Sequence, residues 1–294
     1  MTALSLARHA PASPLARALP YLALAGSVLS VCIGTSFAKQ LFPQVGAPAT
    51  VAYRVGFSAL VLLLVFRPWR LRLKRTDMWA CVRYGVVLGL MNFSFYMSLR
   101  TIPLGLAIAI EFMGPLGVSL YHARRPAHFA VAALAAVGLA ILLPIHHGGH
   151  ALDRGGVAFA ACAGVCWGLY IIFGKRTAHL PGPQTVALGM STAAIIVVPI
   201  GLYNAGTAMF TPSLAAIGFV AAVMSSAVPY TLEMIALKRI PANHFGVLMS
   251  LEPAVGAIAG GLLLGETLLA QQWLAIALIV AASAGSVLAL EKTH

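Results

Sequence analysis

Three glutamates of this sequence fall where the chain is otherwise apolar. Glu111 and Glu252 lie near the middle of apolar runs of about twenty residues, and Glu233 lies close to the end of another. A carboxylate in hydrocarbon costs about 3 kcal/mol, so such a residue normally faces a water-filled cavity, a cation or a proton pathway. These groups could therefore bind a substrate ammonium group or exchange a proton coupled to it.

Each glutamate also has a structural interpretation. Glu111 could form an ion pair with a cation inside the membrane, although we favour the functional role for it. For Glu252 the two interpretations are evenly balanced. For Glu233 we favour the structural one, because its side chain could reach toward Lys238 or Arg239 at the end of its run.

Prolines beside two of these acids predict interrupted helices. Gly114-Pro115 follows Glu111, and Pro253 follows Glu252 directly. Proline has no backbone N–H, so it leaves a carbonyl one turn earlier without its partner. Half-helix ends can hold a carboxylate or an ammonium group. We therefore predict that Pro115 and Pro253 mark helix breaks that flank one cavity.

The predicted cavity wall also offers a cation and several hydrogen-bonding groups. Arg54 could pair with Glu111 or bind a substrate carboxylate, whereas Arg83 lies near enough to the cytoplasmic edge to reach it and is assigned no chemistry. Tyrosines in membranes are often interface anchors, and Tyr53, Tyr96 and Tyr230 could each have that role. The predicted substrate-binding and coupling residues are Glu111, Glu252, Arg54, Asn92, Tyr96, Tyr230 and Glu233.

The composition places these residues in a membrane. Apolar residues make up 60% of the 294, and charged residues only 9%, whereas soluble domains contain roughly 25% charged residues. We predict an all-α polytopic membrane protein with ten spans, which leaves no room for a soluble catalytic or nucleic-acid-binding domain. The spans are 20–38, 47–66, 78–99, 103–121, 127–144, 155–174, 184–203, 213–237, 243–264 and 271–290.

The net charge of +12 indicates topology. If the N-terminus is cytoplasmic, the cytoplasmic segments hold most of the 19 Lys and Arg residues, and the outer loops hold only Lys39, Arg100 and Arg154. The positive-inside rule then places both termini in the cytoplasm. Anionic lipid headgroups are the expected neighbours of the basic residues, and nucleic acid is not an expected partner.

The chain contains an internal duplication. With an offset of 138, Arg100-Thr101-Ile102-Pro103 aligns with Lys238-Arg239-Ile240-Pro241, and similar matches occur elsewhere at nearly the same offset. A unit with an odd number of spans enters the membrane from the opposite side when it is repeated. We therefore predict a 5+5 inverted repeat, typical of transporters with a midplane site. The predicted parts are a cytoplasmic tail 1–18, a first repeat 19–144, an outer loop 145–154 and a second repeat 155–290.

No pattern indicates a metal, a cofactor or an enzyme. Cys162 and Cys166 share one helical face, but no other ligand lies nearby in sequence, so helix packing is the preferred interpretation. His146, His147 and His150 are interpreted as incidental residues of a short solvated loop. Nucleotide-binding loops and nucleophile elbows are also absent from the sequence.

Three stretches carry a family resemblance that covers residues 20–290. They are LFPQVGAPATVAYRVGFSALVLL with RPWRLRL, MNFSFYMSLRTIPLGLAIAIEFMGPLGVSLYHARRP, and PYTLEMIALKRIPANHFGVLMSLEPAVGAIAGGLLLGETL. They resemble the EamA branch of the drug/metabolite transporter superfamily, and within it the threonine/homoserine exporters of bacterial inner membranes. The resemblance implies a ten-helix secondary carrier that exports threonine, homoserine and related small neutral amino acids, driven by the proton gradient.

Several expectations follow about mechanism and partners. Protonation of a cavity carboxylate from outside would favour substrate release there, and proton loss to the inside would reset the site. The expected partners are a small amino acid, protons and membrane lipid, while the sequence does not predict an oligomeric state. The alternative within transport is an EamA-type exporter of another metabolite or a drug. A membrane-embedded enzyme or scaffold is the alternative from another class.

Overall fold

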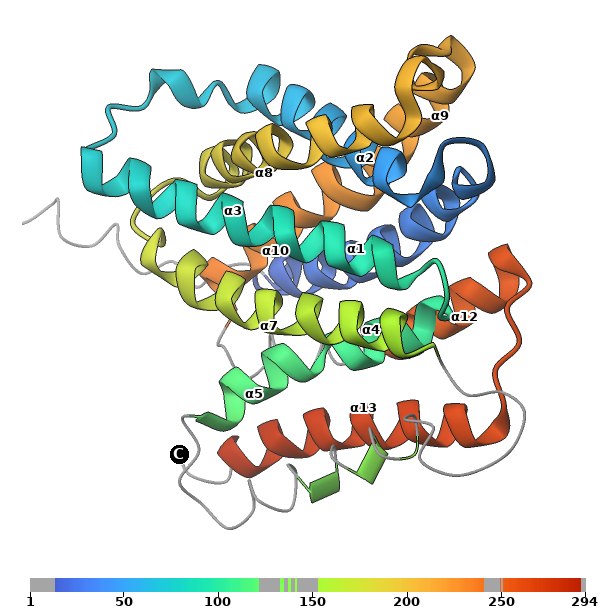
Figure 1. The fold of residues 1–294 in the computed structure, drawn as a ribbon. Helices are drawn as coiled ribbons and strands as arrows, with labels where there is room; N and C mark the ends of the chain where they lie inside the picture. The colour runs from blue at the N-terminus through green and yellow to red at the C-terminus, as the bar shows by residue number, and fades with distance from the viewer. Residues whose placement is uncertain are drawn as a thin grey trace, which may run out of the picture.

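The computed structural model describes residues 14–121, 153–240 and 251–291, together with 133–134, 137–138, 141 and 249 (Figure 1). Within these residues the chain forms helices joined by short connections, and no strand occurs among them. The helices are α1 (Pro14–Lys39), α2 (Phe42–Phe66), α3 (Arg75–Ser98), α4 (Leu104–Glu111), α5 (Met113–Tyr121), α7 (Arg154–Arg176), α8 (Gly182–Ala205), α9 (Pro212–Ala222), α10 (Val228–Arg239), α12 (Glu252–Leu264) and α13 (Ala270–Glu291).

Six described segments are long and apolar enough to cross a membrane. Shorter apolar helices occupy Leu104–Val118, Glu252–Leu264 and Ala270–Ala282. The described part of the chain is therefore all-helical, and the protein is a multi-pass membrane protein. The six segments are Ala18–Lys39, Phe42–Phe66, Arg75–Ser98, Arg154–Arg176, Gly182–Phe210 and Pro212–Ala236.

Most of the predicted spans coincide with helices to within a few residues, and the differences have local causes. Helix α1 begins at Pro14, inside the expected tail 1–18, and residues 1–13 lie outside the described residues. Helix α2 begins at Phe42, but Gly46 has a φ of 76° and bends it just before the predicted start at residue 47. Nearly all of the fifth span and the start of the ninth lie outside the described residues.

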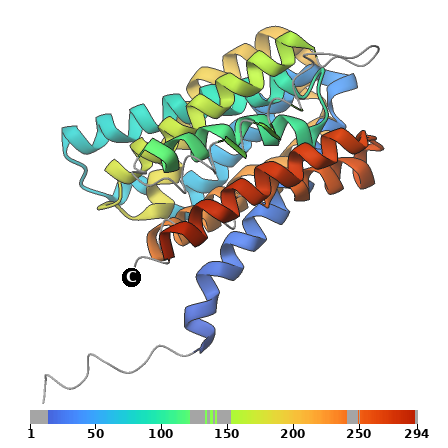
Figure 2. The same cartoon turned by 90° about the horizontal axis from the view of Figure 1, so that it is seen from below.

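The helices pack in antiparallel and crossing pairs around a common centre. Helix α2 packs along α8, α3 along α7, α1 against α10, and α4 against α12. Small residues allow the closest approaches, as is usual between helices in membranes. A methyl group added to Gly85 of α3 would lie 2.5 Å from the carbonyl oxygen of Gly189 in α8. Figure 2 shows α13 on the outside of this bundle.

The start of α7 is fixed by a cap. Asp153 accepts hydrogen bonds from the Gly156 N–H at 2.7 Å and from the Thr101 hydroxyl at 3.0 Å. These two donors, the Gly156 N–H first, hold the pKa of the exposed Asp153 carboxyl below its usual value. The cap thereby joins the start of α7 to the connection between α3 and α4.

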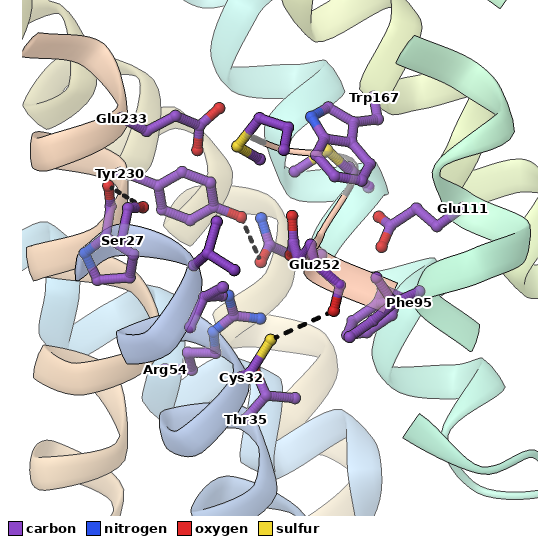
Figure 3. Close-up of a pocket in the computed structure, with 17 residues that line it drawn as sticks. Ser27, Cys32, Thr35, Arg54, Phe95, Glu111, Trp167, Tyr230, Glu233 and Glu252 are labelled. Carbon is purple, nitrogen blue, oxygen red and sulfur yellow. Dashed lines mark hydrogen bonds between the residues drawn. The ribbon is translucent and has the colours of Figure 1, made fainter. Parts of the chain in front are cut away.

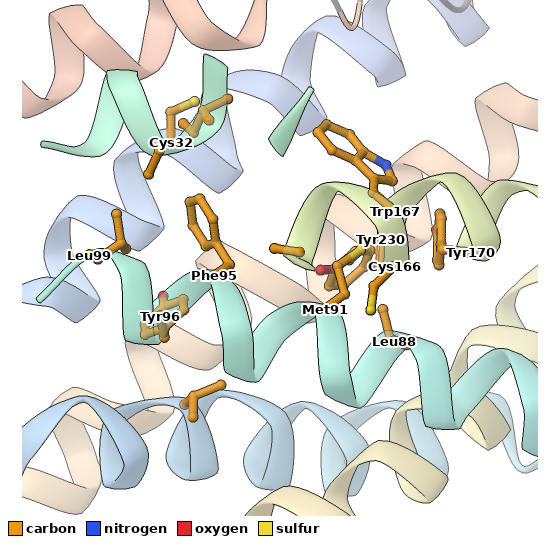
Figure 4. Close-up of a cluster of buried hydrophobic side chains, with 14 of the residues drawn as sticks. Cys32, Leu88, Met91, Phe95, Tyr96, Leu99, Cys166, Trp167, Tyr170 and Tyr230 are labelled. Carbon is orange, nitrogen blue, oxygen red and sulfur yellow. The ribbon is translucent and has the colours of Figure 1, made fainter. Parts of the chain in front are cut away.

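Buried hydrophobic side chains, many of them from α3 and α7, pack around the polar centre of the bundle (Figure 4). The ring centroids of Tyr84 and Tyr170 lie 5.0 Å apart, and those of Tyr170 and Tyr230 lie 6.3 Å apart. Phe112 meets Trp167 edge-on at 5.9 Å. These large rings lock α3, α4, α7 and α10 together, so the polar side chains beside them have few alternative positions.

Candidate functional site

A cavity of about 50 Å³ lies at the centre of the bundle (Figure 3). Helices from both predicted halves line it, namely α1, α2, α3, α4, α7, α10 and α12. Its wall consists of Ser27, Val28, Val31, Cys32, Thr35, Arg54, Met91, Asn92, Phe95, Ile108, Glu111, Trp167, Pro229, Tyr230, Glu233, Met249 and Glu252. A space of this size holds a few water molecules.

The three glutamates singled out in the sequence meet in this cavity. Glu111 is the last residue of α4, Glu252 is the first residue of α12, and Glu233 lies within α10. Their exposed fractions are 7%, 8% and 6%, respectively. Within the described part of the chain, none of them forms an ion pair, and Glu252 Oε2 is buried without a hydrogen-bond partner. The cavity thus collects acidic groups that have no fixed cation.

Arg54 supplies the positive charge of the wall. Its Nη2 donates a hydrogen bond of 2.6 Å to the Ser225 carbonyl, and its guanidinium carbon lies 4.9 Å from the centre of the Tyr96 ring. No ion pair with Glu111 is found among the described residues, and Arg54 Nε has no partner there. The guanidinium group is therefore oriented by a carbonyl and a ring, and part of its hydrogen-bonding capacity is unused.

The carbonyl that binds Arg54 is freed by a proline. In a regular helix the Ser225 carbonyl would accept from residue 229, but Pro229 has no N–H to donate. A wider π-helical turn, η4 (Val223–Ala227), occupies this place between α9 and α10. Neither Ser225 nor Pro229 was among the predicted site residues. A proline inside the apolar run 213–237 is the signal that could have indicated them.

The predicted helix break near Pro115 lies a few residues before that proline. Helix α4 ends at Glu111, and α5 begins at Met113 after the single residue Phe112. The reason is that Pro115 cannot donate to the Glu111 carbonyl. Gly164 of α7 packs against that carbonyl, because a Cβ at this position would lie only 2.7 Å from its oxygen.

Helix α12 begins where the second break is predicted, and most of the ten residues before Leu251 lie outside the described part of the chain. This helix begins at Glu252 with Pro253 in its first turn, and Leu251 precedes it in a turn. Glu111 therefore lies at the C-terminal end of α4, whereas Glu252 lies at the N-terminal end of α12. The carboxylates project into the cavity from helix ends, where the backbone itself also offers polar groups.

Two of the predicted wall residues hydrogen-bond to each other. The Tyr230 hydroxyl donates to Asn92 Oδ1 at 3.1 Å, and Asn92 Nδ2 donates to the Leu88 carbonyl at 2.8 Å. Tyr96 is fully buried behind Arg54 and does not line the cavity. Tyr53 also lies outside the cavity wall, and its hydroxyl donates to the Met209 carbonyl at 2.6 Å.

One acid missed in the sequence joins three lining helices at one end of the bundle. Glu266 Oε1 forms an ion pair of 2.6 Å with Lys39 at the end of α1. Its Oε2 accepts from the Leu104 N–H at the start of α4 at 2.9 Å, and its own N–H donates to Gly260 of α12. The signal was weak, because Glu266 follows an apolar span and looks like a loop residue. We call this cluster the Glu266 node.

The cysteines and histidines contribute no metal-binding group within the described residues. Cys32 lines the cavity, and its thiol lies 3.8 Å from the Glu252 carbonyl oxygen. No group of three metal-ligating side chains occurs in the described part of the chain. The loop with His146, His147 and His150 lies outside it.

Sequence comparison places this chain beside known carriers. The EamA-like transporter family matches residues 154–288. The threonine/homoserine exporter RhtA of Escherichia coli (strain K12) and that of Salmonella typhimurium (strain LT2) are each 47% identical over 274 residues, which covers 93% of this chain and 93% of theirs. The aromatic amino acid exporter YddG of Ancylobacter novellus is 30% identical over 114 residues, or 35% of this chain and 39% of its own.

Structural comparison agrees at the level of the fold. One crystal structure of a protein with 19% sequence identity superposes with a TM-score of 0.64. The match covers 93% of this chain and 98% of the other. The arrangement of the helices is therefore shared with a solved structure over nearly the whole chain.

Proposed function

This chain belongs to the EamA-like transporter family, and from that premise we propose that it exports threonine, homoserine and related small neutral amino acids. The near full-length similarity to RhtA supports the substrate class. The observation that carries the proposal is the central cavity, which combines acidic groups with one oriented arginine. A site with both signs of charge suits a zwitterion, whose ammonium and carboxylate groups must both lose water on entry.

The two ends of the substrate have complementary partners in the wall. Arg54 binds the substrate carboxylate through the guanidinium edge that the Ser225 carbonyl leaves free. Glu111 or Glu252 binds the ammonium group, since both carboxylates lack a fixed cation in the described residues. Phe95 and Trp167 form part of the apolar wall beside these polar groups.

The packing pattern supports a 5+5 inverted repeat with ten spans. Under the sequence offset, α1 corresponds to α7, α2 to α8, α3 to α9 with α10, and α5 to α12. Helices α2 and α8 pack together, so the repeat exchanges this pair onto itself. The pair α1 and α12 is exchanged with the pair α7 and α5, and both pairs pack together. The pair α1 and α10 is exchanged with the pair α7 and α3, which also pack together. The hydrogen bond between Tyr230 and Asn92 joins residues at equivalent positions of the two repeats, as expected near a twofold axis that relates the repeats.

Export proceeds by alternating access and proton antiport, with Glu111 and Glu252 as the coupling groups. A carboxyl group shielded from water exchanges its proton most readily when the cavity opens to one side. A proton that enters from outside neutralises the carboxylate and releases the ammonium group there. Loss of that proton to the cytoplasm restores the charge that binds the next substrate.

Both termini are assigned to the cytoplasm. The connection from α2 to α3 and the end of α7 are rich in Arg and Lys, whereas Lys39, Arg100 and Arg154 lie at the opposite ends of the helices. The positive-inside rule assigns the basic end to the cytoplasm. The Glu266 node then holds the outer ends of α1, α4 and α12 together and closes the cavity on that side.

The substrate assignment is tested with purified protein in liposomes. We expect saturable, gradient-dependent flux of threonine and homoserine that a cationic dye does not reduce. Flux of the dye with no flux of threonine would instead identify an exporter of another compound. Absence of gradient-dependent flux for the whole panel would contradict transport as the function. The Tyr53→Phe protein, which loses a hydrogen bond outside the cavity wall, serves as the matched control and should transport threonine like the wild type.

A further inference from the structure

We propose that the groove between the start of α3 and the end of α7 binds the phosphate of an anionic phospholipid. This groove has a volume of about 290 Å³ and lies apart from the central cavity. Its lining residues are Thr76, Trp79, Ala80, Arg83, Phe173 and Arg176. The proposal does not depend on the transported substrate, because none of these residues lines the central cavity.

Helical spacing gathers the groove residues on two facing surfaces. Thr76, Trp79 and Arg83 follow one another by three, four or seven positions, so they share one face of α3. Phe173 and Arg176 are three positions apart on α7. Helices α3 and α7 pack against each other along their length, so the two faces meet at the groove.

The two arginines of the groove have no acidic partner within the described residues. The ion pairs found there join Lys39 to Glu266 and His179 to Asp77. Asp77 is the acid on the same part of α3, but its Oδ1 lies 3.0 Å from His179 Nε2, so it is paired with the histidine and not with an arginine. The guanidinium groups of Arg83 and Arg176 therefore retain their full capacity to bind an anion, and a phosphate accepts their paired N–H groups well.

Aromatic side chains place this groove at the membrane boundary. Trp79 is 56% exposed, although it belongs to a helix that is apolar enough to cross the membrane. Tryptophan in such a position commonly marks the headgroup level. The Phe173 ring supports Arg176, whose guanidinium carbon lies 5.7 Å from the ring centre.

The position of the groove at the headgroup level and the positive charge of its two arginines favour a lipid as the source of the phosphate. A headgroup phosphate is present at this level at high local concentration, and its acyl chains would continue along the apolar surface of α3 and α7. Basic pockets between helices at the membrane boundary are suited to anionic headgroups. A bound lipid would bridge the two helices that carry Asn92 and Trp167 to the central cavity.

Native mass spectrometry of the purified full-length protein tests the proposal. The protein is titrated with phosphatidylglycerol, with phosphatidylcholine as the neutral lipid and with inorganic phosphate as a competitor. We expect the double variant Arg83→Gln and Arg176→Gln to bind phosphatidylglycerol about thirtyfold more weakly, which corresponds to about 1 kcal/mol for each arginine. Both side chains are exposed, so the variant should fold normally.

A matched control removes the same charge nearby. Arg70 and Arg72 lie in the basic connection before α3 but outside the groove, so replacing both with Gln should change lipid binding less than threefold. Equal losses in the two double variants would overturn the proposal, because they would indicate general attraction to a basic surface. Unchanged binding in the groove variant would also overturn it. Displacement of the lipid by millimolar inorganic phosphate would identify free phosphate as the ligand and refute a lipid site.

Discussion

Replacement of Arg54 by Gln should abolish recognition of the substrate carboxylate. Arg54 is 2% exposed, and its charge is held by the Ser225 carbonyl and the Tyr96 ring. Removing one partner of a buried, hydrogen-bonded charge pair costs about 2–5 kcal/mol. The dissociation constant for threonine should therefore rise by about thirtyfold or more.

A pair of ligands separates recognition from a structural role. Threonine amide carries the same ammonium group and side chain as threonine but has no carboxylate. Wild-type protein should prefer threonine over the amide, and the Arg54→Gln variant should lose most of that preference. The assay is equilibrium binding to purified protein by competition with radiolabelled threonine. The control Tyr53→Phe removes a hydrogen bond outside the cavity and should leave both affinities unchanged.

A structural role gives a different result. The bond from Arg54 to Ser225 joins α2 to the π-helical turn, and a hydrogen bond from a charged group contributes about 1.5–3 kcal/mol to stability. If Arg54 served only that purpose, the variant would unfold at a lower temperature and would lose affinity for threonine and its amide equally. Equal losses would refute the assignment of Arg54 to the carboxylate.

Three further substitutions test the surroundings of the site. Tyr230→Phe removes the hydrogen bond to Asn92 and should destabilise the protein by about 1–2 kcal/mol in thermal unfolding, whereas an unchanged unfolding temperature would contradict this contact. Gly85→Ala places a methyl group against the Gly189 carbonyl and should lower the unfolding temperature with little change in threonine affinity. Glu266→Gln breaks the ion pair with Lys39 and should open the outer side of the cavity. The measurement uses protein whose native cysteines are replaced by serine and which carries Thr35→Cys in the cavity wall. Labelling of this cysteine by an impermeant maleimide from outside should increase. Labelling equal to that of the parent would show that the Glu266 node does not close the outer side.

The sequence predicts the helices well because hydrocarbon imposes a strong constraint. A segment that crosses it must satisfy its backbone internally and carry few charges, so the apolar runs and helices such as α3 and α8 nearly coincide. The same constraint makes Glu111, Glu233 and Glu252 conspicuous. All three do line the central cavity, while their roles in transport stay predictions.

The remaining features depend on distances between segments that sequence alone does not provide. The partner of Arg54 is a backbone carbonyl freed by Pro229 in another span, and no pairing of side-chain types indicates it. Glu266 follows an apolar run, so its contacts with Lys39 and Leu104 become visible only when three helix ends meet. Tyr96 was expected in the wall, but the structure places it behind Arg54 as a supporting ring.

Threonine efflux driven by an imposed pH gradient tests the coupling most directly. Liposomes with wild-type, Glu111→Gln or Glu252→Gln protein are loaded with radiolabelled threonine, and efflux is followed with and without a gradient that drives protons in the opposite direction. The wild-type protein should show faster efflux with the gradient, and at least one variant should retain threonine exchange but lose that acceleration. Acceleration of the wild-type size in both variants would contradict the assignment of proton coupling to these two carboxylates.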